Sequence, residues 1–244
     1  MAIDRLSYPT TVLSMEVDGE DDSEYRILFH GRILYVTIAL GTRDNLTGGL
    51  KTLLSTRVFP SVKCIWHASL IDCMDLTKTR TISPNAFEVT CPLTKLGVQD
   101  KVIAKLARFE WEIQGIERET QAYKMLERPG LAPRFVGYVH EHGRMIDLVL
   151  EKLEGRHGYI EDLSTCQALL QRFHALGLLH GDVNRYNFIV QQGSAKLIDF
   201  EHSRHCPREV EAMNTEISSF HEQLVEEPWR GAGIIFKEIE VHDN

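Results

Sequence analysis

The sequence lacks a long hydrophobic run, an excess of basic residues and a regular cysteine pattern. No stretch of about 18 apolar residues occurs, so we expect no bilayer-spanning segment and no membrane partner. Lysine and arginine number 27 against 35 aspartates and glutamates, which argues against a nucleic-acid partner. The N-terminus has no basic start followed by an apolar stretch, so no secretory signal is visible. The five cysteines are scattered, which favours a reducing compartment. These absences predict a cytoplasmic protein with free thiols.

The chain of 244 residues can form one large domain or two small lobes. Its first third is β-rich in pattern: apolar runs at 25–29 and 33–38 flank Gly31 and predict a hairpin. A short helix is expected over 44–56. The acidic stretch 16–24 lacks the ligand spacing of an EF-hand and is interpreted as a solvated loop. This third carries no recognisable chemistry.

The rest of the chain has clearer periodicity. A helix is predicted over 115–128, a second from Ser164 to just before Gly177, and a long third helix from Pro207. Strands are predicted over 102–109, 135–139 and 146–150, and on both sides of the turn QQGS.

The chemistry is concentrated between His180 and Glu201, which reads HGDVNRYN, a strand, a turn, a second strand and DFE. A hairpin between the two strands would bring Asn187 and Asp199 to the same edge. An amide oxygen and a carboxylate there suit Mg²⁺, which takes substrate phosphates and water as its other ligands. Asp182 would stand nearby, free to accept a proton from an attacking hydroxyl.

This segment resembles the catalytic and metal loops of the protein-kinase-like superfamily, H-x-D-x-x-x-x-N followed by D-F-x. Gly181 and Glu201 make it more similar to aminoglycoside and choline kinases and RIO-type kinases than to ordinary protein kinases. The chain also resembles small fungal kinase-like proteins. The resemblance covers residues 85–225 and implies an α+β, two-lobed protein-kinase-like fold with a reduced C-terminal helical lobe. The implied domains are a β-rich N-terminal extension (1–81), an N-lobe (82–153) and a C-lobe (154–244).

The resemblance also implies a lysine that contacts the nucleotide phosphates, and Lys105 lies in the apolar strand VIAKLARF. Without the downstream motif, a surface lysine would be the simpler interpretation. Its partner should be a glutamate on the following helix. Glu117 shares a helical stripe with polar residues, whereas Glu119 shares one with Ala122 and other apolar residues. We therefore predict the ion pair for Glu119 and a surface position for Glu117.

By the same resemblance, the strand DLVLEKLEG crosses between the lobes and forms the adenine site. Leu150 would lie at the back of the pocket, and Ile103 would cover the base. The backbones of Glu151 and Leu153 would hydrogen-bond the adenine. His180 is expected to be structural, with a hydrogen bond near Asp199.

Three departures from the pattern narrow the function. No G-x-G-x-x-G precedes Lys105, which weakens the case for tight ATP binding. Gly181 replaces an arginine that ordinary protein kinases use to read a phosphorylated activation loop. The 45 residues after Asp199 are too few for a full peptide-binding lobe, which favours a small molecule or one dedicated protein as acceptor.

The sequence thus predicts an ATP- and magnesium-dependent phosphotransferase that acts on a hydroxyl group. A catalytically inactive pseudokinase, serving as a scaffold or regulatory module, is the alternative that the missing glycine loop and short C-lobe leave open. A nucleotide-binding fold with other chemistry, such as nucleotidyl transfer, is a third.

Overall fold

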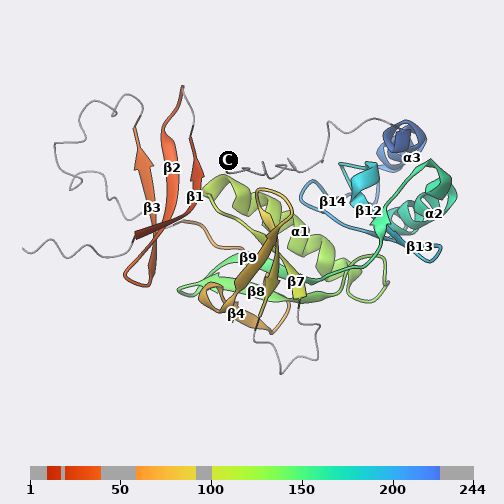
Figure 1. Cartoon of the computed structure of the whole chain (residues 1–244). Coiled ribbons are helices and arrows are strands. Elements are labelled where there is room, and N and C mark those ends of the chain that lie inside the picture. Colours follow the sequence, from red (N-terminus) through yellow and green to blue (C-terminus); the bar gives the residue numbers. More distant parts are fainter. Residues whose placement is uncertain (1–9, 18–19, 40–58, 92–100, 226–244) are drawn as a thin grey trace, which may run out of the picture. The chain divides into compact units, whose positions relative to one another are not determined.

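The structure is a computed structural model that describes residues 10–17, 20–39, 59–91 and 101–225 (Figure 1). The helix expected over 44–56 lies outside the described residues. The chain divides into two compact units. One comprises Met1–Ser61 with Arg108–Glu112, and the other comprises Val62–Ala107 with Ile113–Asn244.

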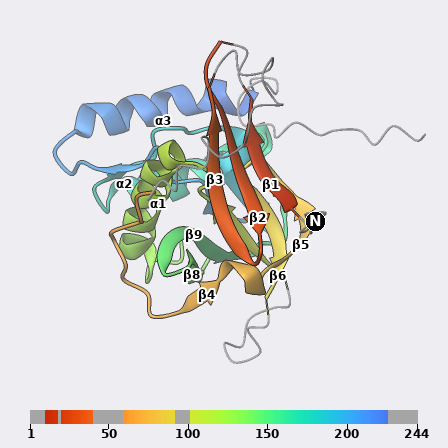
Figure 2. The ribbon, with the colours of Figure 1, turned by 90° about the vertical axis from the view of Figure 1, so that its left-hand side faces the viewer.

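The first unit contains a three-stranded antiparallel sheet in the order β1-β2-β3 (Figure 2). The predicted hairpin is confirmed: Phe29 pairs with Arg32 across a turn at His30 and Gly31, which both have positive φ. Glycine adopts such angles without steric cost. The strands are β1 (Thr10–Glu16), β2 (Ser23–Phe29) and β3 (Arg32–Ile38).

The second unit is built on a six-stranded sheet in the order β4-β8-β9-β7-β6-β5. Only β4 runs parallel to its neighbour β8 in this sheet. Because β4 and β5 belong to it, the sheet extends across the boundary that we expected at residue 82. The strands are β4 (Leu70–Asp72), β5 (Thr77–Thr81), β6 (Ala86–Thr90), β7 (Lys101–Leu106), β8 (Phe135–Glu141) and β9 (Arg144–Glu151).

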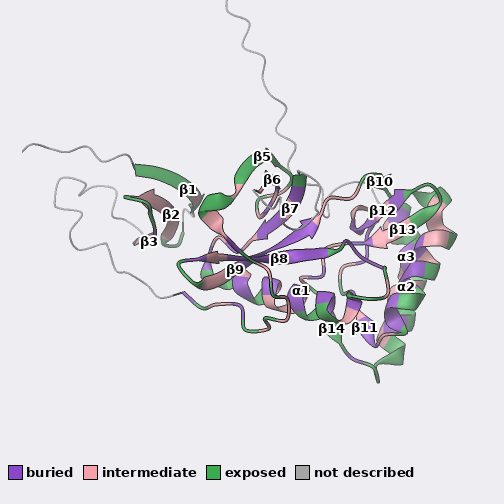
Figure 3. Ribbon diagram, turned by 90° about the horizontal axis from the view of Figure 1, so that it is seen from below, coloured by how far each residue is buried: buried purple, intermediate pink, exposed green. Residues whose placement is uncertain are grey.

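Alternation along β7 sends side chains to two different cores. Val102 and Ala104 join an apolar cluster on one face of the sheet. Ile103 packs on the opposite face against a larger cluster, to which helix α1 (Ile113–Leu126) contributes its buried stripe. Figure 3 shows the buried residues concentrated in β7, β8, β9 and one side of α1. Lys105, two residues after Ile103, therefore points toward α1.

The remaining helices pack on a small hairpin that carries the DFE segment. The helix predicted from Ser164 begins at Leu163, and its N-cap is Asp162. The prediction of a helix from Pro207 was wrong at its start, because the backbone of Cys206 bonds to Gly177 and the helix begins only at Val210. The elements are α2 (Leu163–His174), α3 (Val210–Val225), β10 (Arg156–His157), β11 (Leu178–Leu179), β12 (Phe188–Gln191), β13 (Ser194–Leu197) and β14 (Arg204–His205).

This mixed α+β architecture, with three α-helices among the described residues, is compatible with a kinase-like fold. Within that part of the chain, no helix combines the length and the apolar character needed to cross a bilayer.

Candidate active site

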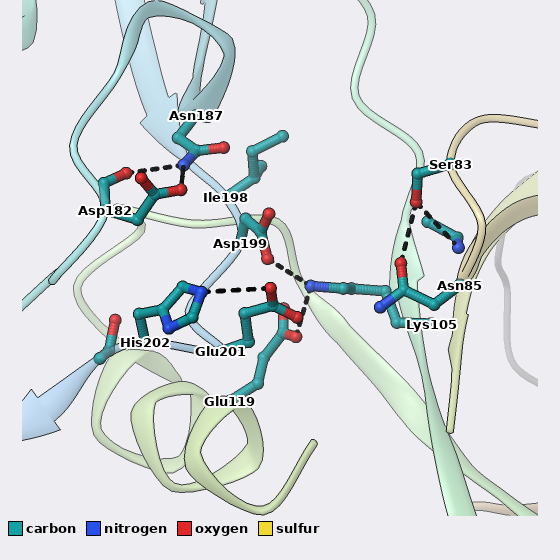
Figure 4. Close-up of polar contacts among 12 residues, drawn as sticks. Ser83, Asn85, Lys105, Glu119, Asp182, Asn187, Ile198, Asp199, Glu201 and His202 are labelled. Atoms are coloured by element: carbon teal, nitrogen blue, oxygen red, sulfur yellow. Dashed lines mark hydrogen bonds and ion pairs between the residues drawn. The ribbon is translucent and has the colours of Figure 1, made fainter. Parts of the chain in front are cut away.

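Lys105 lies between two carboxylates (Figure 4). Its Nζ is 2.6 Å from Oε2 of Glu119 on α1 and 2.6 Å from Oδ1 of Asp199, which follows β13. Glu119 is fully buried, while the side chain of Asp199 keeps 37% of its surface exposed. Three residues that are distant in sequence thus meet at one point, and the carboxylate on the solvent side belongs to Asp199.

The electrostatics of this cluster follow from its burial. Burial raises the pKa of Glu119 to about 7, although Lys105 acts in the opposite direction. Burial would lower the pKa of Lys105, but Glu119 and Asp199 together raise it above its ordinary value. Burial likewise opposes ionisation of Asp199, yet Lys105 holds its pKa below the usual range. Lys105 is therefore charged, and Asp199 is the ionised carboxylate available to a ligand.

The loop from Asp182 to Asn187 is held by its own amide side chains. Asn187 donates through Nδ2 to the backbone oxygen of Asp182 (2.8 Å) and to its Oδ2 (3.2 Å). Asn184, which sequence reasoning missed, donates to the same Oδ2 (3.1 Å) and accepts from the backbone of Tyr186 (2.9 Å). The available signal was the residue type, because asparagine favours Asx-turns in which its side chain accepts from the backbone N–H two residues later. Oδ1 of Asp182 has no partner among the described residues.

The donor set fits a hard cation. The Nδ2 contacts of Asn187 with Asp182 leave the amide oxygen of Asn187 without a partner in the described part of the chain, so it can act as a ligand. In addition, the two carboxylates of Glu119 and Asp199 face only one cationic side chain, that of Lys105. No group of three His, Cys, Asp or Glu side chains with metal-site geometry occurs in the described ranges, which include His202, His205 and Cys206. Mg²⁺ in nucleotide sites needs only one or two carboxylates besides phosphates, and Asp199 with Asn187 meets that requirement.

His180 has the structural position expected for it. The ring is fully buried and Nε2 donates to the carbonyl oxygen of Ile198 (3.0 Å), the residue before Asp199. Burial lowers the pKa of His180, so the neutral form prevails. Asp199 itself has φ of 68°, a left-handed conformation that is strained for a residue with a side chain. The bond from His180 helps to hold this strained residue in place.

Glu216 on α3 holds the start of the loop and was missed by sequence reasoning. Its carboxylate accepts from the backbone N–H of Gly181 (2.7 Å) and of His180 (3.2 Å), and Nε2 of His174 lies 2.6 Å away. Burial opposes ionisation, but these donors lower the pKa of Glu216. Because Glu216 is 35 residues from Gly181, no local pattern could have revealed it.

Gly181 is required by its backbone and surroundings. Its φ is +83°, and a Cβ atom there would lie 2.5 Å from the backbone oxygen of His202. A side chain at this position would therefore clash with the backbone of His202, the residue that follows the DFE segment.

The residues predicted to contact adenine lie along β7, β9 and the chain after β9. Leu150 is buried and pairs with Ile103 across the two strands. The N–H of Glu151 already donates to the carbonyl of Arg134 (2.9 Å), so this N–H is not available to a base. The backbone of Leu153 has no hydrogen bond within the described ranges, so both its groups are free for a ligand.

A polar turn precedes Lys105, in the part of the sequence that has no G-x-G-x-x-G loop. It joins β5 to β6, and Ala86 at its end pairs with Lys105. Oγ of Ser83 donates to Oδ1 of Asn85 (2.9 Å) and accepts from the N–H of Ala86 (3.1 Å). The carbonyl of Asn85 accepts from Leu106 (2.8 Å). Figure 4 shows Ser83 and Asn85 beside Lys105.

Glu117, for which we predicted a surface position, is partly exposed and makes contacts that its helical stripe did not indicate. Its carboxylate accepts from the backbone N–H groups of Lys63 (2.7 Å) and Cys64 (3.2 Å). One turn further along α1, Thr120 accepts from Nε1 of Trp66 (3.1 Å). The segment 62–69 is thereby tied to the helix that carries Glu119, a long-range contact that helical periodicity cannot show.

Residues 156–235 match the model of the lipopolysaccharide kinase (Kdo/WaaP) family, which belongs to the protein-kinase-like superfamily. This segment is about a third of the chain, and it contains Asp182, Asn187 and Asp199. The match indicates a kinase-like phosphotransferase. No curated protein matches the chain.

Proposed function

We propose that the protein is an ATP- and magnesium-dependent phosphotransferase that acts on a hydroxyl group of a small molecule or of a dedicated protein partner. The observation that carries this proposal is the contact of Lys105 with both Glu119 and Asp199, each at 2.6 Å. The family match over residues 156–235 supports it independently, because that segment includes neither Lys105 nor Glu119.

Each residue has a role in the proposed reaction. Lys105, oriented by Glu119, binds the α and β phosphates, and Asp199 with Asn187 would hold Mg²⁺. By the family resemblance, Leu150, Ile103 and the backbones of Glu151 and Leu153 would enclose the adenine. The polar turn of Ser83 and Asn85 would replace the missing glycine loop over the phosphates. When bound, the metal would neutralise phosphate charge and align the transferred group.

The transfer itself is a displacement at the γ phosphorus. The oxygen of the acceptor forms a new bond to phosphorus, the bond to the β–γ bridging oxygen breaks, and ADP leaves with that electron pair. The hydroxyl proton passes to the free Oδ1 of Asp182, whose Oδ2 is held by Asn184 and Asn187. Most of the acceleration would come from positioning and charge stabilisation.

The test is a phosphate-acceptor screen with γ-labelled ATP and magnesium, using the wild type, Asp182→Asn and the exposed control Asp75→Asn. We expect transfer by the wild type and the control, and a loss of about 100-fold or more in Asp182→Asn, in line with removal of a general base. Full activity in Asp182→Asn would refute the mechanism. Absence of transfer to any acceptor by a protein that binds ATP would favour the pseudokinase alternative.

A further inference from the structure

Arg185 lies in the loop between the proposed base Asp182 and the proposed magnesium ligand Asn187. Three residues of chain span at most about 11 Å, so the backbone of Arg185 lies within that distance of Asp182. The proposed mechanism assigns no role to this arginine.

Two tyrosine rings hold the guanidinium of Arg185. Its Cζ is 4.1 Å from the ring centre of Tyr159 and 5.3 Å from that of Tyr186. The backbone carbonyl of Arg185 also accepts from Gly158 (3.1 Å), which fixes the segment that carries Tyr159 beside the loop. Stacking of this kind orients a guanidinium and leaves its edges free for hydrogen bonds.

The charge of Arg185 is not paired within the described part of the chain. The neighbouring Arg156 makes a two-pronged contact with Asp162 (2.5 and 3.0 Å). In contrast, no described carboxylate lies within 4 Å of Arg185, and its Nε is buried without a hydrogen-bond partner. A partly buried cation without a counter-charge is unfavourable, and an anion supplied from outside would relieve that cost.

We infer that Arg185, with Tyr159 and Tyr186, forms a subsite for an anionic group on the phosphate acceptor. This inference rests on the proposed function and refines it. The acceptor is a small hydroxyl-bearing molecule that carries a carboxylate or phosphate, which Arg185 binds through two parallel hydrogen bonds. The ring of Tyr159, 44% exposed, provides an apolar surface for the carbon skeleton.

The experiment compares matched neutral and anionic acceptors. Glucose is compared with gluconate, and glycerol is compared with glycerate and with glycerol 3-phosphate. The carboxylates and the phosphate ester show separately which anionic group the subsite binds. The measured quantity is the ratio of kcat/KM for the acid to that for its neutral partner. We expect the wild type to favour an acid and Arg185→Gln to lower this ratio about 10- to 100-fold, as for loss of a charge-assisted hydrogen bond. Arg185→Lys should fall between them, and the exposed control Arg172→Gln should keep the wild-type ratio.

A parallel measurement separates this inference from the proposed function. Thermal stabilisation by ATP with magnesium should be equal in the wild type and Arg185→Gln. If Arg185→Gln loses that stabilisation, Arg185 belongs to the nucleotide site and the acceptor subsite is wrong. An unchanged acid-to-neutral ratio in Arg185→Gln, or a wild type that binds ATP but phosphorylates none of the acids, also overturns the subsite. A wild type with neither stabilisation nor transfer overturns the proposed function itself.

Discussion

Replacing Glu216 with alanine should loosen the loop that carries Asp182. The change removes the acceptor of two backbone N–H groups and the partner of His174. The N–H of His180 is buried, and leaving such a donor unsatisfied costs about 1–3 kcal/mol. Gly181 is exposed, so water can replace Glu216 there and the added cost is about 0–1 kcal/mol. The expected loss in free energy of unfolding is therefore about 1–4 kcal/mol.

Urea denaturation measures this loss, with the exposed Glu222→Ala on the same helix as control. Glu216→Gln keeps an acceptor oxygen and should lose less. The pKa of Glu216 is lowered in the folded state, so its contribution is fully present above the unfolded pKa of about 4.3 and is lost as the pH falls below it. The stability gap between the wild type and Glu216→Gln should therefore shrink on acidification. A Glu216→Ala protein as stable and as active as Glu222→Ala would refute the reasoning.

Two further substitutions test the site. Gly181→Ala should lower the free energy of unfolding by about 2 kcal/mol or more, because the new Cβ adds a clash with the backbone of His202 to the strain of a positive φ. The control Gly193→Ala also has a positive φ but lies in open space, so it should cost only about 1 kcal/mol. Equal losses in urea denaturation would contradict this reasoning. Glu119→Gln should weaken ATP binding about tenfold by calorimetry, because Lys105 is then held by Asp199 alone; an unchanged dissociation constant would show that Glu119 does not orient Lys105.

The sequence pattern was informative where spacing is local. The helical stripe selected Glu119 over Glu117, and the spacing from Asp182 to Asn187 marked the loop, whereas Lys105 was assigned through the family resemblance because its strand alone favoured a surface lysine. The contacts that hold this loop could not be predicted, because Glu216 reaches Gly181 through packing of α3 and not through any periodic pattern. The start of α3 was misplaced for a similar reason: the backbone of the residues before it pairs elsewhere in the fold, which overrides the preference of proline for a first helical turn.

The most direct test of the central claim is the thermal stabilisation of the protein by ATP with and without magnesium, in the wild type and in Asp199→Asn. A ligand that binds only the folded state stabilises it by about 2.7 kcal/mol at a hundredfold excess over its dissociation constant. We predict a clear rise in Tm that requires magnesium in the wild type, and loss of the magnesium-dependent part in Asp199→Asn. A wild type with no shift at millimolar ATP, or an Asp199→Asn variant with the full magnesium-dependent shift, would contradict the account.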